Sequence, residues 1–271
     1  MRVVIRLAAV AAALLPLACR APVAVEPLDL DEDLAMHYEG QLTASSRLEL
    51  GDDATRASEA GEARDGTEAA PAGALLRVRV IALGHDLAAG LLRSRGQDPD
   101  TGAPLPFVYR AGLVRSDRLD ATLTRLPGEG MDVVEDTRVR VPTAGKASLT
   151  VVNQVSFVRG FELEAEPHAL IADPVIDVVQ EGLLLELEDR GDGQLGTVLH
   201  RADLVRPIAS LDARLFAAGA PVSLQVPLVH AQKLSGGCTL APGHALVLVL
   251  RDPTDRTEGL ETALLVVERA H

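Results

Sequence analysis

Histidine and cysteine, the residues that most often carry chemistry, are few and widely spaced in this chain. The seven histidines show no His-Glu-x-x-His or His-x-His spacing, and the two cysteines, Cys19 and Cys238, lie too far apart to form a zinc motif. No Gly-x-Ser-x-Gly sequence marks a nucleophilic serine, and no spacing singles out a pair of catalytic carboxylates. The sequence therefore predicts a protein that is not an enzyme, with no catalytic residue, no metal site and no cofactor.

One stretch matches a nucleotide-binding pattern in its letters alone. Residues 191–196 read Gly-Asp-Gly-Gln-Leu-Gly, and Asp212 follows at roughly the distance of a ribose-binding acid. A dinucleotide site requires this loop to open a helix, whereas the residues that follow alternate, include β-branched side chains and lead to Pro207. We therefore predict a hairpin turn rather than a cofactor site.

The first eighteen residues are typical of an export signal. Arg2 and Arg6 precede an apolar stretch, Leu7–Leu15, that is too short to span a bilayer but suits a secretory signal peptide. Ala18 and Cys19 come directly after it. Export is therefore the expectation for this chain, with residues 1–18 as the signal peptide.

The Ala18-Cys19 pair resembles the bacterial lipobox, in which the cysteine thiol receives a diacylglycerol, although Pro16 and Leu17 depart from that motif. The resemblance implies a lipid anchor at Cys19 and a location on the periplasmic face of the outer membrane. Ordinary cleavage near Ala21 is the alternative. If Cys19 is lipidated, Cys238 has no disulfide partner, and we expect it to be a small packed residue.

The net charge of −13 limits the choice of partners. A strongly acidic surface argues against nucleic acid and against anionic lipid surfaces as partners. The acidic residues are frequent in residues 19–73, which contain few apolar runs, so we predict a flexible tether there, with a fraying helix over 45–64 as an option. Residues 29–34, Asp-Leu-Asp-Glu-Asp-Leu, lack the glycine and spacing of a calcium loop and are better explained as a solvated acidic run.

Residues 74–271 predict a single domain that is mainly β, built of antiparallel strands and hairpins with one or two short helices. The best helix is 116–126, with Ser116 as its N-cap and Leu119, Leu123 and Leu126 on one face. The expected strands are 75–83, 131–142, 146–152, 155–165, 175–180, 182–188, 195–201, 222–232, 238–241, 244–251 and 262–268.

Three segments of this domain follow a recognisable order. In 134–158 a strand ends in proline, and a short turn leads to an alternating strand; 173–193 has a glycine before alternating leucines and ends in Asp-Gly; 222–250 has a polar strand, then glycine and an apolar strand. The residues that carry this pattern are Pro142, Gly145, Lys146, Ala147, Gly182, Leu185, Leu187, Gly193, Gly243 and Leu246–Leu250.

This pattern resembles the C-terminal domain of bacterial secretins, the ring-forming outer-membrane channels of type II and type III secretion and of type IV pili. The resemblance covers roughly 75–268. It departs from the family at Ala144, where secretins have asparagine, and after Leu250, where the gate segment of secretins is missing. The ring-building domains that precede the channel domain in secretins also have no counterpart in 20–73.

The resemblance implies a non-enzymatic envelope protein that acts as a structural or scaffold component of an outer-membrane export or pilus-type complex. Its partners would be further copies of itself, in a ring or other oligomer, or other secretion components. Pro142, Gly145, Gly182, Gly193 and Gly243 would be structural turn residues. A monomeric periplasmic β-sandwich lipoprotein that binds a ligand or partner protein is the alternative, and an exported hydrolase is a third hypothesis.

Overall fold

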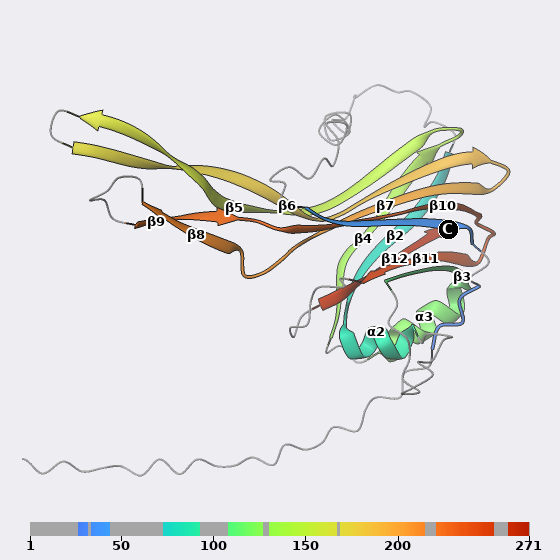
Figure 1. The fold of residues 1–271 in the computed structure, drawn as a ribbon. Coiled ribbons are helices and arrows are strands. Elements are labelled where there is room, and N and C mark those ends of the chain that lie inside the picture. The colour runs from blue at the N-terminus through green and yellow to red at the C-terminus, as the bar shows by residue number, and fades with distance from the viewer. Residues whose placement is uncertain are drawn as a thin grey trace, which may run out of the picture.

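The computed structural model of the chain describes the following residues: 27–31, 34–43, 73–92, 108–126, 130–166, 169–214, 221–251 and 260–270. Over these ranges the protein is mainly β, with antiparallel pairing throughout, which confirms the predicted class (Figure 1). Two five-stranded sheets pack face to face, and a two-stranded sheet lies beside them. The expected signal peptide and Cys19 lie outside the described residues.

The first sheet has the strand order β3-β11-β12-β2-β4. Its strands are β3 (Tyr109–Arg115), β11 (His244–Arg251), β12 (Leu260–Arg269), β2 (Gly73–Gly84) and β4 (Met131–Pro142). Strands β11 and β12 lie in the interior of this sheet and are buried on both faces. This explains the continuous apolar runs at 245–250 and 263–267, because a strand buried on both sides has no polar face to alternate.

The second sheet has the order β1-β10-β7-β6-β5. Its strands are β1 (Met36–Thr43), β10 (Val229–Thr239), β7 (Gln194–Leu204), β6 (Ala169–Gly191) and β5 (Lys146–Glu166). The remaining strands, β8 (Ala209–Arg214) and β9 (Pro221–Val226), pair only with each other, and we call them the short hairpin.

The main core lies between the two sheets. Side chains of β2, β11 and β12 meet those of β6, β7 and β10 there, and Leu185, Leu234 and Leu248 are fully buried. A second core lies on the outer face of the first sheet, beneath helices α2 (His85–Leu91) and α3 (Ser116–Arg125). The first sheet is thus the middle layer of three, as Figure 1 shows.

The two helices owe their position to a short apolar face. Leu119 and Leu123 of α3 point into the second core, as their four-residue spacing predicts. The predicted helix is confirmed, but Ser116 is its first residue rather than its cap. Arg115 occupies the cap position with an extended backbone, and no side chain caps the helix.

Residues 27–31 and 34–43, which we call the strap, close one side of the sandwich. Leu30 is buried in the second core, Asp31 pairs with Leu113 of β3, and Met36–Thr43 then pairs with β10 along its whole length. The sequence predicts a flexible tether over 19–73 and not this strand, because the segment is polar and contains few apolar residues. Packing against β3, α2 and β10 supplies what its own composition lacks.

The β5–β6 hairpin projects far beyond the sandwich. Strand β6 pairs with β7 only from Gly182 to Gly191, whereas its pairing with β5 continues out to Ala169. Residues 154–166 and 169–180 therefore form a two-stranded arm (Figure 1). Two separate strands were expected at 146–152 and 155–165, and two more at 175–180 and 182–188. Each pair is one continuous strand, because cross-strand pairing carries β5 through Asn153-Gln154 and β6 through Glu181-Gly182.

The short hairpin lies against the base of this arm. The backbone N–H of Val158 donates a 2.8 Å hydrogen bond to Oε1 of Gln225 in β9. Phe157 and Val179 of the arm pack with Leu204 and Val229, the residues where β7 and β10 leave the second sheet. Strand β8 is not predicted by the sequence, and the expected strand 222–232 runs from β9 into the start of β10. The helix α2 and strand β3 were also missed, because their sequences show no clear period.

Gly182 marks the point where the arm leaves the sheet. Its φ is +133°, and a Cβ there would lie 2.2 Å from the carbonyl oxygen of Val151. We predict that Gly182→Ala lowers the free energy of unfolding by about 1–3 kcal/mol from backbone strain alone. Urea unfolding of the two proteins measures this difference.

Gly160→Ala is the matched control, because it lies in the same hairpin with nothing within 4 Å of its added Cβ. Equal stability of the Gly182→Ala and Gly160→Ala proteins would contradict the role assigned to Gly182.

Candidate functional site

The side of the sandwich opposite the strap is open. The turn from Pro142 to Gly145, closed by a 2.9 Å hydrogen bond between Gly145 N and Pro142 O, joins β4 to β5. Beyond this turn the two strands belong to different sheets and do not pair. Their free edges therefore border a lateral opening between the two sheets.

A cleft of about 360 Å³ lies in this opening, at the base of the arm. Its walls come from both sheets: β2, β4 and β12 on one side, and β5, β6 and β7 on the other. The aliphatic lining residues are Val80, Ala82, Val134, Val151, Val152, Leu183, Ala202, Leu204 and Ala263. The volume falls within the range of roughly 300–1,000 Å³ that is common for ligand sites.

The charged residues of the cleft are already paired with one another. Arg201 is 8% exposed, and its Nε donates a 2.9 Å hydrogen bond to Asp203 while Nη1 binds the carbonyl oxygen of Leu250 in the opposite sheet. At the rim, Arg206 holds Glu181 through two hydrogen bonds of 2.7 and 2.8 Å. The bonds to Glu181 raise the pKa of Arg206. The cleft therefore presents two ion pairs and no net charge from these four residues.

The closed side has polar contacts of another kind. The rings of Tyr38 in the strap and Tyr109 in β3 stack with centroids 5.1 Å apart. Gln232, which is 2% exposed, donates a 2.8 Å hydrogen bond to the carbonyl oxygen of Arg251 and a 3.2 Å bond to the Tyr38 hydroxyl. Gln232 and Arg201 thus both connect the second sheet to the last carbonyl groups of β11.

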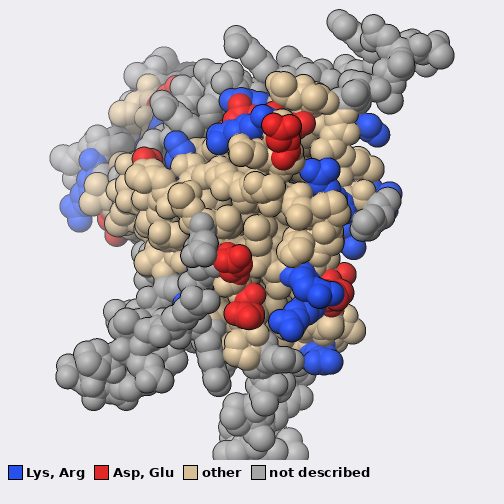
Figure 2. Space-filling view, turned by 90° about the vertical axis from the view of Figure 1, so that its right-hand side faces the viewer, with Lys and Arg blue, Asp and Glu red and all other residues tan. Residues whose placement is uncertain are grey.

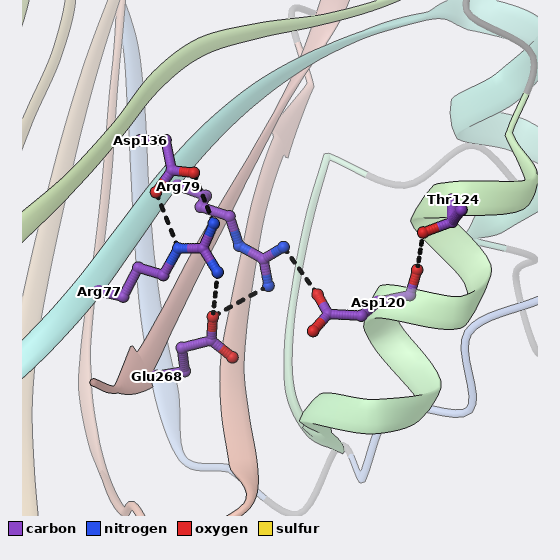
Figure 3. A network of polar contacts seen from close by, with 6 residues as sticks. All are labelled: Arg77, Arg79, Asp120, Thr124, Asp136 and Glu268. Carbon is purple, nitrogen blue, oxygen red and sulfur yellow. Dashed lines mark hydrogen bonds and ion pairs between the residues drawn. The ribbon is translucent and has the colours of Figure 1, made fainter. Parts of the chain in front are cut away.

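A network of charged side chains attaches α3 to the first sheet (Figure 3). Arg77 forms two hydrogen bonds of 2.8 and 2.6 Å with Asp136, and Arg79 lies 2.8 Å from Asp120 of the helix. Both arginines approach Glu268, at 3.6 and 3.2 Å. The hydrogen bonds from Arg77 lower the pKa of Asp136, and the same bonds raise the pKa of Arg77. Opposite charges are matched here, so we interpret the network as structural.

The residues predicted to be structural lie in turns or where strands separate. Pro142 and Gly145 bracket the β4–β5 turn, Gly193 ends the β6–β7 turn and Gly243 lies in the turn before β11. Asp192 and Gly193 have φ of 50° and 76°, as a two-residue hairpin turn of this kind requires, so the turn predicted for residues 191–196 is confirmed. Ala147 packs partly buried against the main core.

The structure brings Gly182, but not the other four structural turn residues, to the cleft. The residues that sequence reasoning missed are Val134, Asn153, Arg201 and Asp203, which come from three strands and converge only in the folded chain. The sequence marks this region only by the interruption of the alternating apolar and polar pattern at Asn153-Gln154, where the arm begins.

Cys238 is a buried free cysteine outside the cleft. Burial raises the pKa of the Cys238 thiol to about 11, so the thiol stays protonated near neutral pH. Within the described residues, no group of three or more His, Cys, Asp or Glu side chains is placed to hold a metal ion. Of residues 29–34, Glu32 and Asp33 lie outside the described part. No helix in the described ranges is long and apolar enough to cross a membrane.

Searches with this chain against protein-family models, curated proteins and solved structures each found no match.

Arg79 offers a direct test of the structural interpretation of the network. We predict that Arg79→Met lowers the free energy of unfolding by about 3 kcal/mol, because Glu268, which is 8% exposed, then keeps only the more distant Arg77. Urea denaturation measures this loss. Arg115→Ala removes an exposed arginine that pairs with Asp117 and should leave the midpoint nearly unchanged. Similar midpoints for both variants would contradict the interpretation.

His200 should make stability depend on pH. Burial, followed by the charge of Lys233, lowers the pKa of His200 below its ordinary value of 6.5. The unfolded chain therefore binds a proton more readily, so the free energy of unfolding should fall as pH decreases below about 6.5. Thermal unfolding between pH 5 and 7 should show this slope, and His200→Gln should reduce it. An unchanged slope in the variant would assign the effect to other groups.

Proposed function

We propose that this protein is a non-enzymatic, self-associating structural component of a bacterial envelope complex, with a secretin-like β-domain. The arm is the observation that carries the proposal. Its exposed aliphatic residues include Leu163 at 48%, Ile171 at 43% and Ile176 at 56%, and Leu211 of the adjacent short hairpin is 60% exposed. A surface of this kind is typical of a contact with another molecule.

The pairing of the arm supports the same proposal. Between Ala169 and Glu181, β6 pairs with β5 alone among the described strands. The other edge of this part of β6 therefore presents backbone N–H and C=O groups to solvent. A two-stranded hairpin is marginally stable alone in water, and long free edges are usually covered. A further copy of this chain supplies strands of the same length and character.

Exposed aliphatic side chains lie at one end of the molecule. The large hydrophobic residues that are most exposed in the described ranges lie in the arm, in the short hairpin or at the end of the sandwich from which these project. Figure 2 shows the opposite end, where basic and acidic side chains lie near one another around uncharged surface. We propose that the arm end is the assembly face and that the opposite end stays in solvent.

The place of the protein in the cell is part of the proposal. Export through residues 1–18 and a lipid at Cys19 would hold the domain on the periplasmic face of the outer membrane. The strap shortens the tether, because the chain is already packed at Leu28, whose N–H donates a 2.8 Å hydrogen bond to the carbonyl oxygen of Leu91. Only residues 20–27 would then separate the anchor from the folded domain.

A second candidate function rests on the cleft. Its volume of about 360 Å³ and its aliphatic walls suit a small apolar ligand or a single strand of a partner protein. In this case the protein would be a monomeric binding module.

The native mass of the full-length protein separates the two candidates. After extraction from membranes in mild detergent, light scattering should give a discrete oligomer for the wild type. Ile176→Lys should reduce it to monomer, because it places a charge on the exposed apolar surface of the arm.

Thr143→Lys is the matched control, since it adds the same charge to an exposed turn at the opposite end and should not change the mass. A wild-type monomer would reject self-association, and a protein found only in the soluble fraction would reject the anchor.

A further inference from the structure

We infer that the arm of one copy lies across the lateral cleft of the next copy, in a head-to-tail contact. This inference rests on the proposed self-association and specifies which two surfaces meet. It distinguishes an array in which each arm reaches a neighbour's sandwich from one in which arms pair only with arms.

Two separate apolar surfaces of the same chain need cover. One is the arm, with Ile176 at 56% exposed. The other is the margin of the cleft, where Val134 of β4 is 46% exposed. Pairing of arms alone would bury the first surface and leave the second in water. A head-to-tail contact buries both at once, so it removes more apolar area per subunit.

The backbone edges match in the same way. Strands β4 and β5 end their sheets on either side of the opening, so each has a free edge toward the cleft. The arm offers the free edge of β6 between Ala169 and Glu181. A strand that enters such an opening can add backbone hydrogen bonds to an edge while its alternate side chains enter the aliphatic lining.

The charges of the described arm residues favour the cleft over a second arm. Glu162 and Asp173 are exposed, whereas Arg159 is already held 3.2 Å from Asp177, so two arms side by side bring like charges together. The four charged residues of the cleft have no net charge, and the side chain of Arg206 at its rim is 57% exposed. Contact between unlike surfaces lacks the repulsion of the arm-to-arm contact.

Such a contact joins different patches of two identical subunits. A heterologous contact of this kind leaves one arm and one cleft unused at the two ends of any open array. A closed ring uses all of them and gives a discrete mass, whereas an open filament gives a distribution of masses.

Cysteine crosslinking tests the inference in the full-length protein with Cys238 replaced by Ser. Val134→Cys and Ile176→Cys are made in separate chains that carry different tags, co-expressed, and treated with a short bismaleimide. We expect a crosslinked dimer that carries both tags, and little crosslinking when either variant is expressed alone.

Thr143→Cys, exposed at the opposite end, replaces Val134→Cys in the control and should not crosslink to Ile176→Cys. Light scattering on the same samples shows whether the oligomer persists. An intact oligomer in which Ile176→Cys crosslinks only to itself, or does not crosslink to Val134→Cys, would overturn the head-to-tail contact while leaving self-association standing. A monomeric sample would overturn both.

Discussion

Burial of strands β11 and β12 on both faces is the constraint on which the rest of the fold depends. One face of this pair meets the second sheet in the main core, and the other meets helices α2 and α3 in the second core. Neither strand has a polar face, so both cores must form for either strand to be satisfied. The fold therefore has three layers, and β3 and β4 are the edge strands of the first sheet. Each edge strand borders one side of the sandwich.

The side of the sandwich at β3 is closed by the strap, whereas the side at β4 is open. At β3 the strap crosses from the second core to the second sheet, and Gly112 lets it approach closely, since a Cβ there would lie 2.6 Å from Cβ of Leu30. At β4 no described segment closes the gap, and β5 turns away into the other sheet. On this open side the edges of β4 and β5 have no strand partner among the described residues. The cleft and the arm adjoin each other because both arise where Gly182 separates β6 from β7.

The ion pairs of the described residues lie mainly where elements pack against one another. Ion pairs hold α3 to the first sheet, and other pairs neutralise the cleft. The charged residues that line the cleft are therefore matched, although the whole chain is strongly acidic and the arm carries the exposed Glu162 and Asp173. The neutral cleft does not repel an acidic surface, whereas a second acidic surface would oppose it.

The β class, the helix predicted at 116–126 and found at Ser116–Arg125, the hairpin turn at Asp192-Gly193 and the apolar strands β11 and β12 all follow from the sequence. Each of these depends on neighbours along the chain: the spacing of Leu119 and Leu123, the need for positive φ at Gly193, or an unbroken apolar run. Tertiary structure alone decided the strap, the continuity of β5 through Asn153, and the cleft. A polar segment becomes a strand only when β10 offers it an edge, and a cleft forms only when sheets from distant residues diverge. These features are set by partners in space, which local periodicity does not encode.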